Sequence, residues 1–499
     1  MAVKVMECDL LVLGAGGTSL VAAVKAADDT GRNVIVLEKT KKPGGATTFM
    51  HVFPIKDSKW QKEAGETISN PPSMSGQFFD WLVSKGGAEE YFKMAKPGDR
   101  GASIFGTVSM YKIMEKYKDR DDPSIGPGWT GTYIVEKMLE CCKKMGIPVI
   151  TNARAKKFIT DASGKVTGVM ADTADGELQV NCKACYMGMG GFGSDYERCK
   201  KLWPGDFNNK PMMRISPPSH TGDWIGMATE IGAKVDLETA FIELAGGVHH
   251  PYSYSIFSMI LKKETMAPRP EWLVINLNGE RWSWPTHRIG GIGYTGKVDA
   301  QHKVGSIANP DPLSNLPGAA IYVIGDQRIT DMIGERMVAD DWDMTAIPLL
   351  KKWREHVEYE AALDDAKTSH GNHTKKADTL EELALKMDID PKVFLATVER
   401  YNKLCDGGKD LDFGKDPAAL MPIRNPPYYA FWAHRFSQTT NGGIMTNDKM
   451  EVLDTKGKPM PGLFAGGQCA TSPSGLRDRV GTIGYIAGIH AGNYLKSLG

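Results

Sequence analysis

The sequence predicts an α/β protein whose N-terminus forms a strand, a helix and a second, parallel strand. Three segments of the first forty residues carry this prediction: the apolar run DLLVLGAGG, the Ala-rich helical stretch SLVAAVKAADDTG and the second apolar run NVIVLEK. The first strand is expected over Cys8 to Leu13. Apolar runs joined through a glycine turn and a helix are typical of parallel strands, so we expect the chain to start with a βαβ unit.

Glycines in the turn after the first strand indicate a bound dinucleotide. Gly14, Gly16 and Gly17 let the backbone turn tightly and approach a pyrophosphate, and the next helix offers unpaired N–H groups to that anion. Ser19 replaces the third glycine and is small enough for the helix to pack near the strand. Glu38 closes the second strand, where its carboxylate can accept hydrogen bonds from an adenosine ribose. We interpret the unit as Rossmann-type, since a glycine turn in another α/β unit would leave Glu38 unexplained.

Length and charge exclude several function classes. At 499 residues the chain is too long for one compact core, so two or three domains are expected. Lys plus Arg and Asp plus Glu each total 60, without a long basic or acidic tract, so neither nucleic acid nor an anionic membrane surface is indicated as a partner. There is no basic leader and no stretch approaching about 18 apolar residues, so we expect a soluble, cytoplasmic protein without membrane insertion.

The cysteines do not indicate an internal redox chain or a metal site. Of eight cysteines, Cys182 and Cys185 form one CxxC, and no CxxCH haem motif or four-cysteine cluster occurs. The CxxC lies in the alternating stretch LQVNCKACYMGMGG, which reads as a strand. We interpret it as packing rather than redox or metal chemistry, because a second CxxC is missing. Any electrons that this chain exchanges must therefore enter or leave from outside the polypeptide, or come from a soluble reductant that serves as an external donor.

The rest of the chain changes character twice. Residues 50–125 are polar, loop-rich and punctuated by Pro and Gly, 129–146 look helical, and short strands and turns follow. Residues 245–435 carry three tryptophans within a short stretch, several Pro-rich turns and two charged helical segments, LLKKWREHVEYEAALDDA and TLEELALKMDIDPKVFLATVERYNKL. We interpret this part as an inserted domain. No internal repeat is found.

Six motifs, taken together and in their order along the chain, indicate a protein family. They are GAGGTS with Glu38-Lys39, then Gly44-Gly45, GKVTGVMA, MGMGGFGSDYE, HTGDWIGMATEIGA and, near the C-terminus, MEVLDTKGKPMPGLFAGG. This set resembles the flavoprotein subunits and soluble enzymes of the fumarate reductase, urocanate reductase and 3-ketosteroid dehydrogenase group. The resemblance spans nearly the whole chain, and the C-terminal motif is the most specific part of it.

The resemblance implies a Rossmann-type FAD-binding domain interrupted by a smaller α+β capping domain. We expect the FAD domain over 1–244 and 436–499 and the cap over 245–435. In covalently flavinylated members a histidine lies just past the dinucleotide motif, where this chain has Ala46 or a nearby threonine, so FAD is expected to be noncovalent and His51 to be an ordinary loop residue. The residues that the resemblance places at the FAD are Gly14, Gly16, Gly17, Ser19, Glu38, Lys39, Gly45, Ala46, Thr47, Gly190, Gly191, Asp223, Gly466, Gly467, Gly481, Thr482 and Ile483.

Candidate catalytic residues follow from the same resemblance. Hydride exchange at flavin N5 leaves the protein to orient the substrate, polarise it and supply a proton. The family's His-Pro step matches His250-Pro251, and its arginine beyond a Gly-x-Arg-aromatic turn matches Arg288, which follows Gly279-Glu280-Arg281-Trp282. Arg288 is the candidate proton donor, although an arginine needs help from its environment to lose a proton. A salt bridge on the cap surface is the alternative for Arg288.

The arginine near the C-terminus matches Arg479, in an Arg-Val-Gly step, with Arg477 two residues earlier. A guanidinium can bind a carboxylate through two parallel hydrogen bonds, so this residue favours an acidic substrate. The alternatives are that an arginine here contacts the FAD pyrophosphate or caps the following helix.

Two departures from the family pattern affect the substrate. Where fumarate reductases have a histidine before a glycine pair, this chain has Thr439 or Thr440, and the residues that relay protons have only approximate matches. A larger unsaturated acid or an enone is therefore expected in place of fumarate. Tyr252 or Tyr254 can supply a phenolic donor, as tyrosines do in ketosteroid dehydrogenases, or can simply fill the core.

The sequence thus predicts an FAD-dependent reductase of the double bond in a small α,β-unsaturated carboxylate. The alternatives are an enone or steroid-type dehydrogenase of the same family, and a flavin-bearing electron-transfer subunit of a partner complex. The substrate, the direction of the reaction, the electron donor and the oligomeric state stay open.

Overall fold

The structure is a computed structural model in which two compact units are distinguished. The first unit comprises Met1–Leu202, Ser216–Ile242 and Thr439–Gly499, and the second comprises Trp203–Ile215 and Glu243–Gln438. The assignment of these units as a cofactor domain and a cap stays a prediction. The structure describes residues 3–49, 55–63, 65, 69–71, 73–85, 93–94, 108–109, 129–202, 213–214, 217–247, 261–262, 267–268, 272–282, 320–328, 374–471 and 481–499.

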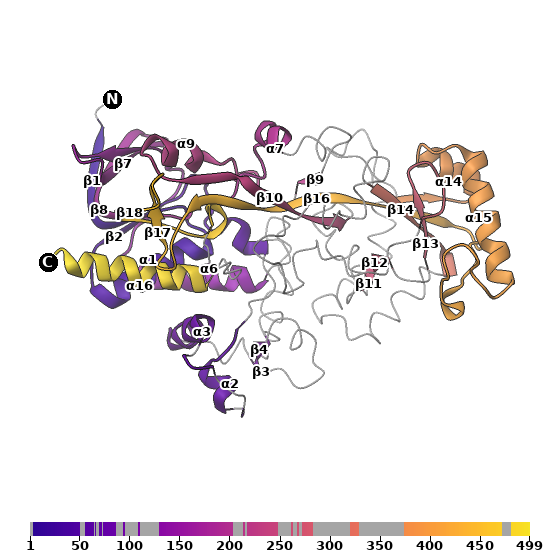
Figure 1. Ribbon diagram of the computed structural model, residues 1–499, viewed down its shortest axis with the longest axis horizontal. Coiled ribbons are helices and arrows are strands. Elements are labelled where there is room, and N and C mark those ends of the chain that lie inside the picture. The colour runs from indigo at the N-terminus through magenta and orange to yellow at the C-terminus, as the bar shows by residue number, and fades with distance from the viewer. Residues whose placement is uncertain are drawn as a thin grey trace. The chain divides into compact units, whose positions relative to one another are not determined.

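The first unit is built on a mainly parallel sheet with the order β17-β18-β8-β1-β2-β5 (Figure 1). All neighbours pair in parallel except β17, which forms an antiparallel hairpin with β18. The strand bounds are Lys4–Leu13 for β1, Val34–Leu37 for β2, Val149–Ile150 for β5, Gly176–Met187 for β8, Glu451–Leu453 for β17 and Pro459–Ala465 for β18. The predicted βαβ unit is confirmed, and the C-terminal motif MEVLDTKGKPMPGLFAGG forms the hairpin of β17 and β18.

Three helices complete the core of the first unit: α1 (Gly17–Thr30), α6 (Trp129–Lys144) and α16 (Thr482–Ser497). The first eleven residues of α1 are buried on every side, which its small Gly, Ala and Ser side chains allow. A Cβ atom on Gly484 of α16 would lie 2.3 Å from the Thr18 carbonyl oxygen, so the two helix backbones touch. The close packing of α1 against α16 fixes the C-terminal helix beside the N-terminal strand–helix unit (Figure 1).

An antiparallel meander extends the sheet through β6 (Arg154–Thr160), β7 (Val166–Thr173) and β8. Turns at residues 161–165 and 174–175 join the three strands. Cys182 and Cys185 of β8 are both buried and reduced, and burial raises the pKa of the Cys185 thiol well above its usual range. These features favour the packing interpretation of the CxxC, because a protonated, inaccessible thiol is inert.

One stretch differs from expectation. Residues 50–125 are predicted as loop-rich, yet α3 (Met74–Ser84) lies there, preceded by the short α2 (Lys59–Glu63). Helix α3 begins after Ser73, whose hydroxyl accepts a hydrogen bond from the Ser75 N–H. It is held by burial of Phe78 and Phe79, a tertiary contact that local composition does not reveal.

Short elements connect the larger ones. In the first unit they are η1 (Gly45–Phe49), β3 (Lys93–Met94), β4 (Val108–Ser109), α7 (Tyr196–Leu202), α9 (Asp223–Glu230), η4 (Gly467–Cys469) and β19 (Ala470–Thr471). In the second they are β9 (Met213–Arg214), β11 (Leu261–Lys262), β12 (Ala267–Pro268) and η3 (Pro417–Ala419). Two long strands, β10 (Val235–Gly247) and β16 (Tyr428–Met445), contribute residues to both units.

The second unit contains an antiparallel sheet covered by two helices. Strand β14 (Ala320–Asp326) pairs with β13 (Leu273–Asn276) and with β16, which also pairs with β15 (Thr374–Ala377). The predicted helical stretch TLEELALKMDIDPKVFLATVERYNKL forms α14 (Leu380–Lys386) and α15 (Pro391–Asp406), separated where Asp390 caps α15 and Pro391 takes its first position. The second predicted stretch, LLKKWREHVEYEAALDDA, lies outside the described residues.

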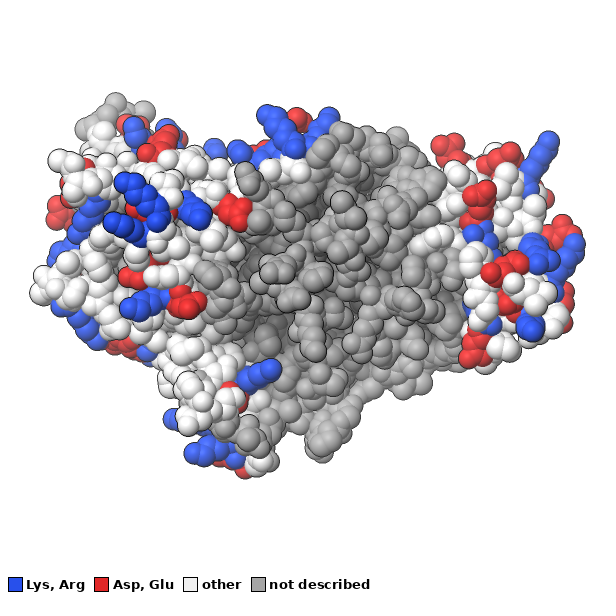
Figure 2. All heavy atoms as spheres, viewed as in Figure 1, with Lys and Arg blue, Asp and Glu red and all other residues white. Residues whose placement is uncertain are grey.

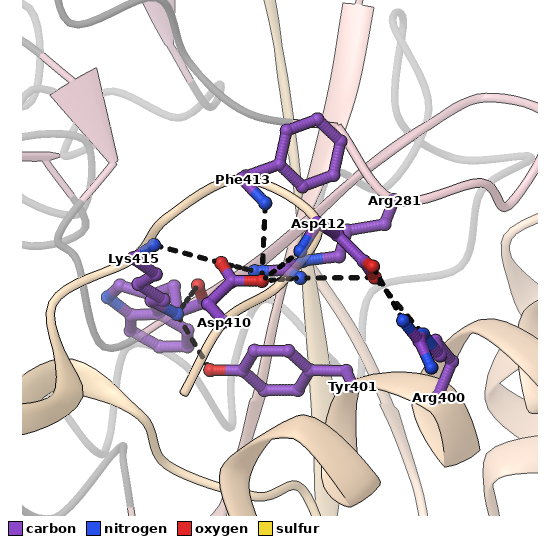
Figure 3. A network of polar contacts seen from close by, with 8 residues as sticks. Arg281, Arg400, Tyr401, Asp410, Asp412, Phe413 and Lys415 are labelled. Atoms are coloured by element: carbon purple, nitrogen blue, oxygen red, sulfur yellow. Dashed lines mark hydrogen bonds and ion pairs between the residues drawn. The ribbon is translucent and has the colours of Figure 1, made fainter. Parts of the chain in front are cut away.

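A buried ion pair joins distant segments of the second unit (Figure 3). Arg281 donates to both carboxylate oxygens of Asp410, from Nη1 to Oδ1 at 2.8 Å and from Nη2 to Oδ2 at 2.7 Å. The side chains are 12% and 0% exposed. Burial alone would raise the pKa of Asp410, but the Arg281 hydrogen bonds outweigh it and hold that pKa well below its usual range. Arg281, which the sequence uses only as a landmark before Arg288, therefore anchors the loop after α15.

Lys415 extends this cluster. Its ammonium nitrogen lies 2.7 Å from the Tyr401 hydroxyl and 2.9 Å from the Trp272 carbonyl oxygen (Figure 3). Burial, and then the charge of Arg281, lowers the pKa of Lys415 to about 7. The Arg281 guanidinium also lies 4.9 Å from the centre of the Tyr401 ring, so cations and aromatic faces alternate in this core.

On the face shown in Figure 2, blue Lys and Arg and red Asp and Glu side chains alternate over the described residues. No single-sign field covers the described part of that face, in keeping with equal totals of acidic and basic residues. Among the helices of the described segments, none has the length and apolar character needed to cross a bilayer.

Candidate functional site

The candidate site is the edge of the first unit's sheet where the parallel strands end. A glycine follows each of three neighbouring strands: Gly14 after β1, Gly188 after β8 and Gly466 after β18. Hydrogen bonds bind the turns to one another, from Gly14 N–H to the Leu37 carbonyl oxygen at 2.7 Å and from Gly188 N–H to that of Leu13 at 2.9 Å. The carboxyl ends of parallel strands are where open α/β sheets bind ligands, so this edge is the expected place for a cofactor.

The first glycine turn has the geometry that a dinucleotide needs. Gly14 has φ +89°, and a Cβ atom there would lie 2.5 Å from the Gly188 carbonyl oxygen, so only glycine fits. Gly16, in contrast, has open space beside it, because the nearest protein atom to an added Cβ would be 3.8 Å away. Ser19, in place of the third glycine, is fully buried and its hydroxyl lies 3.2 Å from the Gly188 carbonyl oxygen. The room that the protein leaves at Gly16 suits a pyrophosphate approaching the backbone.

The start of α1 is arranged for an anion. No acidic side chain occupies the first turn of α1, and its N-cap, Gly16, offers no side chain to its N–H groups. Gly17 N–H donates to the Thr47 hydroxyl at 2.8 Å, and Gly44 N–H donates to the Ala15 carbonyl oxygen at 2.8 Å. These contacts bring Thr47, together with the half-buried Gly45 and Ala46, against the helix terminus, where the helix dipole favours negative charge.

Glu38 lies at the end of β2 with only 9% of its surface exposed. Its Oε2 accepts from Ala15 N–H at 2.8 Å, and its Oε1 accepts from the Thr40 N–H at 2.8 Å and the Thr40 hydroxyl at 2.7 Å. A carboxylate offers about four acceptor positions, so one on Oε2 is left for a ribose hydroxyl. The carboxylate that the sequence singles out is thus fixed and still able to accept.

Lys39 and Asp223 belong to one ion-pair network. The Lys39 ammonium contacts the Thr221 hydroxyl at 2.9 Å and Asp223 at 3.1 Å, and Arg154 binds both oxygens of Asp223 at 2.9 Å. Burial raises the pKa of Asp223, but the Arg154 hydrogen bonds and the neighbouring Thr221 and Lys39 outweigh it and lower the pKa to about 2. The network ties the end of β2 to β6 and α9, which holds the loop that carries Glu38.

The remaining predicted residues lie along the β8, β18 and α16 side of the same edge. Gly190 and Gly191 follow β8, Gly466 and Gly467 follow β18, and Gly481, Thr482 and Ile483 start α16. A Cβ atom on Gly466 would lie 2.5 Å from both the Ile483 side chain and the Tyr186 hydroxyl. The structure therefore brings all seventeen predicted cofactor residues into one unit; their contact with FAD stays a prediction.

Two residues that the sequence prediction left out line this edge. His220, the first residue of the HTGDWIGMATEIGA motif, has a ring that is 5% exposed and reaches the glycines after β8. Gln468 follows Gly467, and its side chain lies against Gly191. His220 belongs to a motif that is visible in the sequence and Gln468 directly follows another, but the direction of both side chains toward the glycine turns depends on the tertiary fold.

These residues fit FAD. The open space at Gly16, the helix terminus without an acidic residue and the remaining acceptor position on Glu38 match the pyrophosphate and the ribose of a dinucleotide. The fully buried Tyr186 hydroxyl, beside Gly466, has no hydrogen-bond partner within the described segments, and an unpaired buried hydroxyl points to a ligand that satisfies it.

The predicted catalytic residues cannot be placed at this site. His250, Tyr252, Arg288 and Arg479 lie outside the described residues, and so does the side chain of Thr439, whose backbone belongs to β16. Thr440, the alternative to Thr439, is 1% exposed and its hydroxyl accepts from Phe192 N–H at 3.1 Å, so it holds the segment after β8. No cluster of His, Cys, Asp and Glu suited to a metal ion occurs in the part of the chain that the structure describes.

Comparison with known families decides the cofactor. The family model described as FAD binding domain matches residues 117–484, well over half of the chain. The chain belongs to this family of FAD-binding proteins. A model described as FAD dependent oxidoreductase matches residues 9–186, the segment that holds β1, α1 and Glu38. The chain is therefore an FAD-dependent oxidoreductase with FAD as its cofactor, and the predicted family and cofactor are confirmed.

Similar FAD-dependent proteins cover almost the whole chain. A vinyl phenol reductase of Lactiplantibacillus plantarum is 25% identical over 94% of this chain and 90% of its own length. A urocanate reductase of Eggerthella lenta is 27% identical over 97% of this chain and 74% of its own length, and a cytochrome-type fumarate reductase of Shewanella frigidimarina is 24% identical over 98% and 77%.

Solved structures support the fold of this FAD-binding chain. A flavocytochrome c3 fumarate reductase in an open conformation gives a TM-score of 0.70 at 21% identity, covering 98% of this chain and 79% of that one. A 3-ketosteroid-Δ4-(5α)-dehydrogenase from Rhodococcus jostii gives 0.60 at 21% identity, covering 98% and 97%. The predicted α/β class is confirmed as the fumarate-reductase type of flavoprotein fold.

Proposed function

We propose that this flavoprotein reduces the carbon–carbon double bond of a small α,β-unsaturated carboxylate. The observation that carries the proposal is the glycine-lined sheet edge in a chain whose full-length relatives are named reductases of vinyl phenol, urocanate and fumarate. Bound FAD, once reduced by an external electron donor, would supply the hydride from flavin N5. The chain must then bind the carboxylate, hold the double bond near the flavin and give a proton to the second carbon.

In this proposal two arginines perform the chain's own steps. Arg479 binds the substrate carboxylate through two parallel hydrogen bonds, which fixes the position of the double bond. Arg288 gives up a proton to the carbon next to the one that receives hydride, and solvent restores that proton. His250 and Tyr252 supply further hydrogen bonds to the substrate. We also propose that the second unit is the cap that excludes water from the site.

The test is anaerobic reoxidation of the reduced flavoprotein. Flavin absorbance is followed while enoates and enones are added one at a time. We expect rapid reoxidation by at least one enoate, loss of nearly all of this rate in Arg288→Ala and Arg288→Lys, and unchanged FAD content in both variants. Normal turnover in the Arg288 variants would exclude this residue as the proton donor.

A second candidate function is reduction or dehydrogenation of an enone. Thr439 favours it, because a histidine that would bind a carboxylate is missing there. Activity on neutral ketones without activity on the matching acids would reverse the ranking. A third reading, an electron-transfer subunit, predicts copurification with an iron–sulfur or flavin protein and no enoate reduction by the isolated chain.

A further inference from the structure

Two backbone hydrogen bonds fix the position of His220. Its N–H donates to the Pro217 carbonyl oxygen at 2.8 Å, and its carbonyl oxygen accepts from Ser194 N–H at 2.9 Å. The residue lies three positions before the first residue of α9, in the segment that faces the glycine turn after β8. With 5% of its surface exposed, the ring has little freedom to move.

The ring contacts two glycine turns of the FAD site. Gly191 N–H donates to Nδ1 at 3.4 Å. A Cβ atom on Gly190 would lie 2.7 Å from Nε2, and one on Gly45 would lie 3.8 Å from it. Gly190 also has φ +76°, so an L side chain at this position would be strained and would collide with the ring. The imidazole therefore lies between the turn after β2 and the turn after β8.

The contact with Gly191 requires a neutral ring, because a protonated Nδ1 would face the N–H donor with a second donor. Burial, and then the charge of Lys39, lowers the pKa of His220 to about 4. The other groups against the ring, from the turns after β8 and β18, are the uncharged Gly190, Gly191 and Gln468. The ring is thus neutral at ordinary pH and can accept at Nδ1.

Gln468 lies against the same turn as the His220 ring. Its carboxamide oxygen would lie 2.9 Å from a Cβ atom on Gly191 and is close enough to the ring to favour a protonated nitrogen. Because Nδ1 accepts from Gly191, the neutral ring carries its proton on Nε2. His220, Gly191 and Gln468 therefore form one buried polar cluster beside the turn after β8.

We propose that His220 is a positioning residue for FAD: by accepting the Gly191 N–H at Nδ1, it holds the glycine turn after β8 in the conformation that admits the cofactor. The inference rests on the identity of the cofactor and not on the proposed reaction, so it can fail while the reaction stands. Nδ1 is the atom that accepts the hydrogen bond, and Nε2 packs against Gly190 and Gly45.

The test compares three replacements of His220 in the full chain, with FAD affinity of the apoprotein measured by flavin fluorescence. His220→Asn keeps an acceptor near the Nδ1 position, His220→Gln places its polar group near Nε2, and His220→Leu has neither. Loss of one hydrogen bond corresponds to about a tenfold rise in Kd. We expect this rise in His220→Leu and in His220→Gln, with His220→Asn within about threefold of the wild type.

Ser194→Ala is the matched control, because the Ser194 hydroxyl binds the Pro217 carbonyl oxygen in the same segment and its replacement leaves the Gly191 and His220 side of the contact unchanged. Its FAD affinity should equal that of the wild type. Circular dichroism and urea midpoints of the apoproteins identify any variant that fails to fold. Equal affinities for His220→Leu and the wild type, rescue by glutamine but not asparagine, or an equal loss in Ser194→Ala would each overturn the proposal.

Discussion

The candidate cofactor site of the first unit and the buried ion-pair cluster of the second unit are built in different ways. The candidate FAD site of the first unit is made mainly of backbone, from glycine turns at the ends of parallel strands and a helix terminus, together with one fixed carboxylate, Glu38. The cluster around Arg281 in the second unit is made of charged side chains from segments far apart in the sequence. A backbone site is sensitive to one added methyl group, whereas a buried ion pair is sensitive to loss of a partner.

Function and stability are therefore encoded differently in the described residues. Gly16 at the sheet edge leaves room for a ligand, so a substitution there acts first on cofactor binding. Arg281 and Asp410 leave no room and satisfy each other, so a substitution there acts first on folding. Four predictions, ordered by decreasing effect, test this division.

Arg281→Ala should have the largest effect on stability. It leaves the Asp410 carboxylate buried without its cation, and breaking such a pair costs about 3–5 kcal/mol. Urea unfolding of the full chain, followed by circular dichroism, measures the loss. FAD affinity of the folded fraction should change little. A loss below about 1 kcal/mol would show that the pair does not stabilise this unit.

The stability of the second unit should rise with pH above neutrality through Lys415. Its folded pKa is about 7, below the usual value of 10.5, so the unfolded chain binds the proton more tightly between these values. The contribution is complete above the unfolded pKa and is lost as pH falls toward 7. The expected slope is about 1 kcal/mol per pH unit between pH 8 and pH 10.

Lys415→Gln keeps hydrogen-bond donors near Tyr401 and Trp272 but cannot titrate. In this variant the urea unfolding free energy should vary less with pH over the same range. An unchanged slope would assign the pH dependence to other groups.

Gly16→Ala should abolish tight FAD binding without unfolding the protein. The nearest protein atom to the added methyl group is 3.8 Å away, so the fold accepts it, but the methyl occupies the space left for the pyrophosphate. Overpacking of about 1–3 kcal/mol corresponds to a Kd increase of roughly 5- to 150-fold. Gly226→Ala, on the exposed face of α9 with no atom within 4 Å, is the control and should bind FAD normally.

Arg400→Ala should have the smallest effect. Arg400 binds both oxygens of Asp412 close to the Arg281 cluster, but its side chain is 56% exposed. Exposed pairs contribute little to the free energy of unfolding because solvent screens them, and less still in high salt. If Arg400→Ala lowered the free energy of unfolding as much as Arg281→Ala does, burial would not determine how much each arginine contributes to stability.

Much of the first unit could be predicted from the sequence because its signals are local. The βαβ unit, the glycine turn, Glu38 and the C-terminal hairpin each rest on residues that lie near one another in the chain. Helix α3 was missed because Phe78 and Phe79 are buried by distant segments. The helix α15 was found, since its periodicity and its Asp390-Pro391 start are local too.

The α/β class and the FAD family could be inferred without a structure, because strand–helix alternation and the glycine motifs depend on residues that are neighbours in the chain. Only the folded arrangement shows that His220 faces the Gly190–Gly191 turn, that Lys39 and Asp223 share one network, and that Arg281 binds Asp410. Each of these is a contact between residues far apart in the chain, and such contacts depend on how the elements pack.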